Sequence, residues 1–96
     1  MELAGLRLDP VARSVTYGGR EVELSAREFA VLECLARHGG EPVSRTQLLE
    51  HVWSEGDVSL NVVDVYVGYL RKKLEDSAGP PLIRTVRGVG FMVEAA

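Results

Sequence analysis

The chain has 96 residues, 46% of them hydrophobic and 26% charged, which is the size and balance of one ordinary globular domain. Its formal net charge of −3 does not favour a nucleic-acid partner, and no apolar run approaches the roughly 20 residues of a membrane span. The single cysteine, Cys34, excludes an internal disulfide and is expected to be a small buried hydrophobic residue.

Short strands are predicted for the first quarter of the chain. Leu6–Leu8 alternates between apolar and polar residues and runs into the turn pair Asp9-Pro10. Residues 14–17 and 20–24 alternate in the same way on either side of Gly18-Gly19, a pattern typical of a β-hairpin. Because these strands are short and polar on one face, we expect them to flank the core without building it.

Two helices are predicted next, each with the same start signal. Ser25 and Glu28 form a capping box, in which a serine side chain and a glutamate three residues later satisfy each other's backbone N–H groups. This helix is expected to end at Gly39-Gly40. Ser44 and Gln47 repeat the pattern at the start of a shorter helix, which the polar stretch after it is expected to stop.

A third helix is predicted from about Ser59 or Asn61 to about Glu75. Its buried face is expected to comprise the apolar residues at i, i+4, i+7 and i+11, which are Val63, Val67, Leu70 and Leu74. The opposite face is expected to carry Asn61, Val65, Gly68 and Lys72, with Tyr69 beside it. Asp64 is expected to pair with Arg71 two turns away or to cap its own helix.

A second hairpin is predicted at the end of the chain, after the helix-breaking segment 77–81. Its extended runs are Leu82–Arg87 and Phe91–Glu94, joined by the glycine-rich turn Gly88-Val89-Gly90. The order of strands, three helices and hairpin predicts an α+β domain. We expect one domain over 1–96, with an ordered core of about 6–93.

Positive charge is distributed unevenly along the chain. Residues 1–57 carry six basic and ten acidic side chains, whereas residues 58–96 carry five and four. The five basic residues of the second part all lie between positions 71 and 87, and they are Arg71, Lys72, Lys73, Arg84 and Arg87. A major groove accepts one α-helix, so the third helix followed by an arginine-bearing hairpin fits duplex DNA. The same residues also fit an ordinary solvated surface.

The outward groups of the third helix suit particular DNA contacts. Asn61 can bond adenine, and Val65 can pack on a thymine methyl group. Tyr69 suits a sugar or phosphate contact, and Arg71 and Lys72 suit phosphates.

Four segments resemble the effector domain of OmpR/PhoB-type response regulators, and they are residues 24–29, 43–49, 63–74 and 85–91. The last reads Thr-Val-Arg-Gly-Val-Gly-Phe. The resemblance covers nearly the whole chain, from about Leu6 to Val93. It implies a winged helix-turn-helix, with an N-terminal antiparallel sheet, a three-helix core and a C-terminal β-hairpin wing. It also implies sequence-specific binding of double-stranded promoter DNA and control of transcription within a two-component system.

The resemblance places the recognition helix, 59–75, in the major groove and the wing, 82–94, near the minor groove. The positions that match base contacts are Asn61, Val65 and Tyr69, and those that match backbone contacts are Tyr66, Arg71 and Thr85. Arg87 matches the minor-groove contact of the wing. Gly68 and Lys72, on the same outward face of the helix, complete the expected DNA-binding set.

This chain departs from the family pattern at two places. Many members carry two consecutive basic residues where this chain has Gly68-Tyr69, and many carry arginine at the position of Asn61. Guanine is usually bonded by arginine or lysine. We therefore expect recognition to depend on A·T contacts and on DNA shape.

The resemblance also implies partners. The loop 54–60 matches the segment that touches RNA polymerase, so Glu55 and Asp57 are candidate polymerase contacts. Two copies are expected to bind head to tail on a direct repeat, while the isolated domain is a monomer. A receiver domain is missing from this chain, since it needs about as many residues again.

Other classes of function have less support. Paired titratable groups suited to catalysis are not found, so no enzyme is expected. Two histidines and one cysteine at unrelated spacings predict no metal site, and no cofactor is expected. A winged helix that binds protein remains an alternative because of the acidic balance. The first seven residues lack a signal-peptide layout, which predicts a cytoplasmic location, although the cytoplasmic domain of a membrane-anchored regulator remains open.

Overall fold

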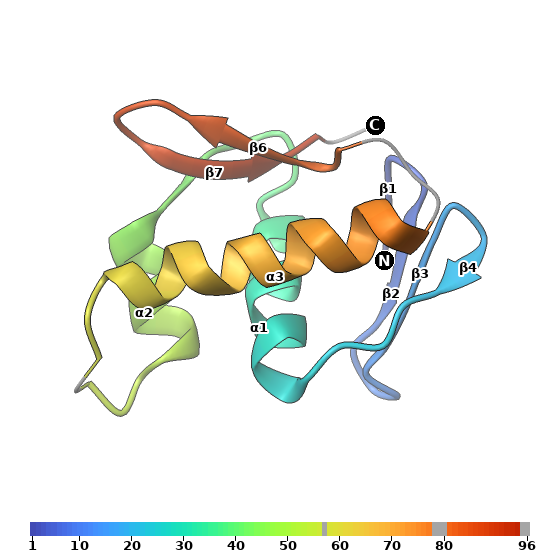
Figure 1. Cartoon of the computed structure of the whole chain (residues 1–96), viewed down its shortest axis with the longest axis horizontal. Helices are drawn as coiled ribbons and strands as arrows, with labels where there is room; N and C mark the ends of the chain where they lie inside the picture. Colours follow the sequence, from blue (N-terminus) through green and yellow to red (C-terminus); the bar gives the residue numbers. More distant parts are fainter. Residues whose placement is uncertain (57, 78–80, 95–96) are drawn as a thin grey trace.

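The computed structural model describes residues 1–56, 58–77 and 81–94. Within these ranges the elements, in chain order, are β1 (Glu2–Leu3), β2 (Leu6–Asp9), β3 (Ser14–Tyr17), β4 (Arg20–Glu21), α1 (Ala26–Arg37), β5 (Val43–Ser44), α2 (Arg45–Val52), α3 (Asn61–Ser77), β6 (Ile83–Val86) and β7 (Gly90–Val93). An N-terminal sheet lies at one end of the molecule, and the β6–β7 hairpin runs above α3 (Figure 1). This is the predicted α+β winged helix-turn-helix order.

The N-terminal sheet is antiparallel, with the strand order β1-β2-β3-β4. The expectation that its strands only flank the core is wrong. Leu6, Leu8, Val15 and Tyr17 are each at most 2% exposed and belong to the main hydrophobic core. The reason is the period of two along a strand, which directs every second side chain of β2 and β3 to the same buried face.

The strand boundaries differ from the expected ones in the wing, where β6 is Ile83–Val86 and β7 is Gly90–Val93, and in three further places. β1 begins at Glu2, before the expected start of the ordered core near residue 6. β4 ends at Glu21, although the backbone N–H of Val22 still donates to the carbonyl of Val15 at 3.0 Å. β5 was not expected, because two residues beside a helix cap carry no pattern of their own.

Both capping boxes are confirmed. The hydroxyl of Ser25 accepts from the N–H of Glu28 at 3.1 Å, and the carboxylate of Glu28 accepts from the N–H of Ser25 at 2.8 Å. Ser44 and Gln47 make the same reciprocal bonds at the start of α2. These side chains satisfy backbone donors that the first turn of a helix leaves free.

Glu28 has a second partner that the sequence did not indicate. Its side chain is nearly fully buried, and the ammonium group of Lys73, on α3, lies 2.6 Å from it. Burial alone raises the pKa of Glu28, but hydrogen bonds from Lys73 and Ser25 outweigh burial and lower the pKa below 4.5. This carboxylate therefore joins the start of α1 to α3 in its ionised form.

Acidification should destabilise the fold through Glu28. Because its pKa is depressed in the folded chain, ionised Glu28 stabilises the fold above pH 4.5, and this contribution is lost as the pH falls below that value. We expect the urea midpoint to fall less between pH 6 and pH 3.5 in Glu28→Gln than in the parent. Equal losses in the two proteins would contradict this assignment.

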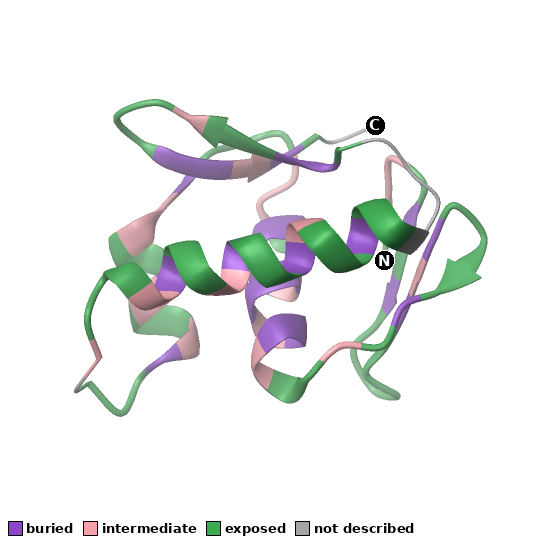
Figure 2. Cartoon of the chain, viewed as in Figure 1, coloured by how far each residue is buried: buried purple, intermediate pink, exposed green. Residues whose placement is uncertain are grey.

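The third helix has the predicted buried stripe, and it extends two residues beyond the expected end. Val63, Val67, Leu70 and Leu74 are at most 1% exposed and pack with residues of α1 such as Leu32 and Leu35 in the core. The other side of α3 is exposed along much of its length (Figure 2). None of the described helices has the length and hydrophobicity needed to cross a membrane.

The wing belongs to a three-stranded sheet with the order β5-β7-β6. β7 is central, so Phe91 pairs with Val43 on one side and with Thr85 on the other. Gly90 pairs with Ser44, and a Cβ atom at Gly90 would lie 2.0 Å from the carbonyl oxygen of Val43. Glycine is therefore required where the wing passes the start of α2.

Candidate nucleic-acid interface

The outward face of α3 presents the residues that the sequence placed there. Asn61, Gly68 and Lys72 are exposed, and Val65 and Tyr69 are 46% and 51% exposed. Large apolar groups on the surface of a soluble domain commonly mark an interaction site when they lie together. The N-terminal half of α3 lies on the same side of the molecule as the wing turn (Figure 1).

Tyr66 differs from these residues because it is only partly exposed. Its ring makes edge-to-face contacts with Trp53 at 5.2 Å and with Tyr69 at 5.4 Å between ring centroids. Trp53 is buried at the end of α2, and the guanidinium of Arg27 stands 5.3 Å from its ring centroid. Tyr69 is thus held by a row of aromatic rings that begins in the core.

Arg71 is turned toward the wing. Its Nη2 atom donates to Thr85 Oγ1 at 2.7 Å and to the carbonyl oxygen of Ile83 at 3.1 Å, and Nε lies 3.3 Å from the same carbonyl. Arg71 therefore joins α3 to β6. The guanidinium that was predicted to contact a phosphate also makes hydrogen bonds within the protein. Thr85 is exposed and accepts the hydrogen bond.

The expected pair between Asp64 and Arg71 is wrong. Asp64 accepts a hydrogen bond from Nε of Arg45 at 2.9 Å, and Arg45 is the first residue of α2. The spacing within α3 allowed Asp64 to pair with Arg71 or to cap its own helix. Its observed partner, Arg45, lies 19 positions away in the sequence but within hydrogen-bond distance in space. The guanidinium of Arg45 also lies over the ring of Phe91, 4.7 Å from its centroid.

The five basic residues between positions 71 and 87 provide fewer free charges than their number suggests. Lys73 pairs with Glu28, and Arg84 pairs with Glu94 at 2.7 Å. Within the described part of the chain, no ion pair involves Lys72 or Arg87, and both are exposed. Lys72 therefore lies on the outward face of α3 and Arg87 in the turn of the wing, each without an ion pair among the described residues, whereas Arg71 is hydrogen-bonded to neutral groups of β6.

The loop before α3 contains the two candidate polymerase contacts. The carboxylate of Glu55 accepts a hydrogen bond from Arg27 at 2.7 Å, which lowers the pKa of Glu55. Arg27 also donates to the carbonyl oxygen of Val52 at 2.6 Å, so this bond fixes the loop to α1 and α2. Asp57 lies outside the described residues.

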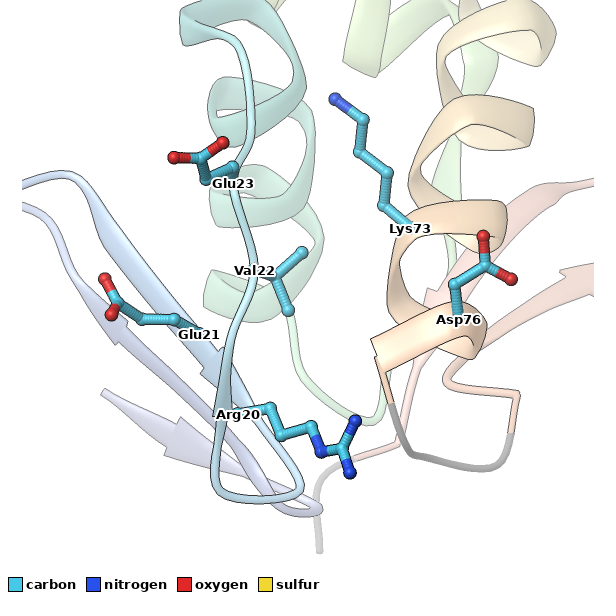
Figure 3. Close-up of a pocket in the computed structure, with 6 residues that line it drawn as sticks. All are labelled: Arg20, Glu21, Val22, Glu23, Lys73 and Asp76. Carbon is cyan, nitrogen blue, oxygen red and sulfur yellow. The ribbon is translucent and has the colours of Figure 1, made fainter.

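A polar groove opens between the N-terminal sheet and the C-terminal half of α3 (Figure 3). Side chains of both signs line it, and they are Arg20, Glu21, Glu23, Lys73 and Asp76, with Val22 between them. Lys73 is already paired with Glu28. The groove lies at the other end of α3 from the wing turn.

The cysteine and histidines have structural surroundings. Cys34 is buried, as predicted, and burial raises the pKa of its thiol. Nδ1 of His38 lies 2.9 Å from the carbonyl oxygen of Cys34, and Nδ1 of His51 lies 3.1 Å from that of Gln47. No group of three metal-ligating side chains occurs among the described residues.

Comparisons with known proteins identify the family. Residues 19–93 match the sequence profile described as "Transcriptional regulatory protein, C terminal". The chain belongs to this family, the C-terminal domains of OmpR/PhoB-type regulators. The family assignment confirms the resemblance that the motifs of α1, α3 and the wing predicted.

Two relatives in this family are similar over most of the chain. The response regulator MprA of Mycobacterium sp. (strain KMS) is 47% identical over 92% of the chain, which spans 39% of that protein. The transcriptional regulatory protein PrrA of Mycobacterium leprae (strain TN) is 48% identical over 92% of the chain, which spans 38% of that protein. The chain therefore spans about two fifths of the length of these relatives.

A solved structure supports the same family at the level of the fold. The RstA DNA-binding domain of Klebsiella pneumoniae, determined in complex with the RstA box, is 37% identical with a TM-score of 0.83. The match covers 100% of this chain and 97% of that domain. The winged-helix architecture is thereby confirmed.

Proposed function

We propose that this domain binds double-stranded promoter DNA in a sequence-specific way, with α3 in the major groove and the wing near the minor groove. The observation that carries the proposal is the joint exposure of the α3 face and the Arg87 turn on one side of the molecule. A helix supplies base contacts from its outward side chains, and an arginine suits a narrow minor groove. Family membership and the DNA complex of the RstA domain support the same function.

The outward face favours A·T base pairs over guanine. Arg71 is directed at the wing and Lys73 at Glu28, so the exposed groups nearest the start of the helix are the amide of Asn61, the isopropyl group of Val65 and the ring of Tyr69. An amide can bond adenine and an apolar group can contact the methyl of thymine, whereas a guanine contact usually needs arginine or lysine. We infer an operator core rich in A·T pairs.

Selection of bound sequences from a random duplex pool, at near-physiological salt, tests the proposal. Enrichment of an A·T-rich direct repeat would support both specific recognition and head-to-tail binding of two copies. No enrichment by folded protein would reject specific DNA binding by this domain. The same selection identifies the operator used in the experiments below.

Lys72→Ala should weaken binding about equally on all sequences. Lys72 is exposed on α3 without an ion pair in the described chain, so it is available for a phosphate. Losing one phosphate contact should reduce the slope of log Kd against log salt by about 1.

Arg7→Ala is the matched control for this measurement. Arg7 pairs with Glu2 on the N-terminal sheet, and its loss changes the net charge of the protein by the same amount. We expect the parent slope in Arg7→Ala. Equal slopes for Lys72→Ala and the parent would remove Lys72 from the interface.

A second candidate function is binding of a protein partner. The net charge of −3 and the exposed apolar side chains of Leu60, Val65 and Tyr69 favour it. Salt separates the two functions, because DNA binding weakens steeply as salt rises while an apolar protein contact does not.

We propose that this domain is part of a longer regulator, which contains a receiver domain and operates in a two-component system in the cytoplasm. Glu55 and the rest of loop 54–60 are proposed to contact RNA polymerase. The isolated domain is proposed to be a monomer that pairs on a direct repeat. The relatives named as response regulators are longer than this chain, which supports the proposal that the regulator has a further domain.

A further inference from the structure

Four side chains meet where α2, α3 and the wing come together, and they are Arg45, Asp64, Arg71 and Phe91, here called the Phe91 cluster. Phe91 is 2% exposed, at the centre of the β5-β7-β6 sheet. The guanidinium carbons of Arg45 and Arg71 lie 4.7 and 5.5 Å from the centroid of its ring. Both distances allow cation–π attraction, so β7 is held by charged groups from two helices.

Each arginine of the Phe91 cluster is fixed by further hydrogen bonds. Arg45 donates to Asp64 of α3 at 2.9 Å. Arg71 donates to Thr85 Oγ1 at 2.7 Å and to a backbone carbonyl of β6. A planar guanidinium with two directed contacts has little freedom to rotate, so both arginines fix the wing relative to α3.

The wing turn follows directly from this fixed point. Thr85 pairs with Phe91, and the next pair, Val86 with Gly90, closes the turn that holds Arg87. A shift of the Phe91 cluster therefore shifts Arg87 relative to α3. The attraction of an arginine into a minor groove depends on groove width, and hence on where the arginine is held.

We propose that Arg45 and Asp64 are positioning residues that hold the wing at the angle to α3 at which Arg87 distinguishes narrow from wide minor grooves. The proposal rests on the proposed DNA binding. Neither residue belongs to the predicted contact set, because the Arg45 guanidinium is bonded to Asp64 and lies over Phe91.

A purely structural role predicts a different outcome from a positioning role. The Arg45 and Asp64 side chains are 33% and 48% exposed, and such pairs contribute little to stability. We therefore expect thermal unfolding to change little when the pair is removed. The preference for a flanking sequence, in contrast, should change strongly.

The test uses the selected operator with either an A·T tract or a G·C tract beneath the wing. The parent should prefer the A·T duplex by about fivefold, and Asp64→Ala and Arg45→Met should reduce this ratio below about twofold. The ratio cancels any general change in affinity caused by the altered charge. Glu33→Ala, which breaks a pair of equal 2.9 Å length on α1, should keep the parent ratio.

Arg87→Ala provides a double-mutant cycle. In that background Asp64→Ala should not further reduce the preference for the A·T duplex over the G·C duplex, because the arginine that Asp64 helps to position is absent. Independent losses from the two substitutions would overturn the proposal.

A measurement without DNA separates this inference from the proposed function. Amide hydrogen exchange of β6 and β7 should be faster in Asp64→Ala and Arg45→Met than in Glu33→Ala, while α1 exchanges as in the parent. Unchanged exchange in the hairpin, or an unchanged flank ratio, would overturn the inference. A parent that binds no duplex would reject DNA binding itself, and hydrogen exchange alone would then decide whether the Phe91 cluster holds the wing.

Discussion

Gly90→Ala is expected to destabilise the domain by about 3 kcal/mol, at the upper end of the usual cost of an added methyl group in a tight site. The new Cβ would lie 2.0 Å from the carbonyl oxygen of Val43 and 2.8 Å from Cα of Ser44. Both are backbone atoms of β5, so the clash can be relieved only if β7 moves away from β5. Urea unfolding followed by circular dichroism measures the loss, which corresponds to at least about 12 °C in Tm.

Gly68→Ala is the matched control for this substitution. A Cβ at Gly68 meets no atom within 4 Å, and the residue lies in the interior of α3. Alanine is favoured over glycine in a helix by about 1 kcal/mol, so Gly68→Ala should stabilise the fold. If both variants unfolded at the same urea concentration, the close approach of β7 to β5 would be wrong.

Arg87→Ala is expected to weaken DNA binding about tenfold, or roughly 1.4 kcal/mol, on operators with an A·T tract beneath the wing. Arg87 is exposed in the turn between β6 and β7 and has no ion pair in the described part of the chain. A free guanidinium at a projecting turn is suited to the negative potential of a narrow minor groove. Fluorescence anisotropy with labelled duplexes at fixed salt measures the effect.

Arg84→Ala controls for loss of a positive charge from the same hairpin. Arg84 is bonded to Glu94 at 2.7 Å, so its charge is already balanced within the protein. We expect a much smaller effect than for Arg87→Ala. Unchanged affinity of Arg87→Ala on the A·T duplex would remove the wing from the proposed DNA contact.

The exposed face of α3 was predicted well, because the burial of the opposite face decides which residues are exposed. The four-residue stripe of α3 left only one outward face, so Asn61, Val65 and Lys72 could be placed from spacing alone. Arg71 was harder to place, because a residue beside the stripe can face solvent or a neighbouring element. Its turn toward β6 is set by the position of the wing.

Local rules determined much of this protein from its sequence. The capping boxes at Ser25 and Ser44 depend on residues three positions apart, and the burial of α3 depends on a period of about 3.6 residues. The turn at Gly88 follows from local conformational preference, since its φ is 76°. Such features need only neighbouring residues, so they are visible without coordinates.

The tertiary structure alone decided the partners of charged side chains. Lys73 reaches Glu28 across 45 residues of sequence, and Arg45 reaches Asp64 across 19. Several acidic residues could have paired with each cation, and no local rule selects among them, because an ion pair depends on distance in space. The same reason explains why Lys72 and Arg87 have no ion pair in the described part of the chain and why the Phe91 cluster appears only when α2, α3 and the wing are assembled.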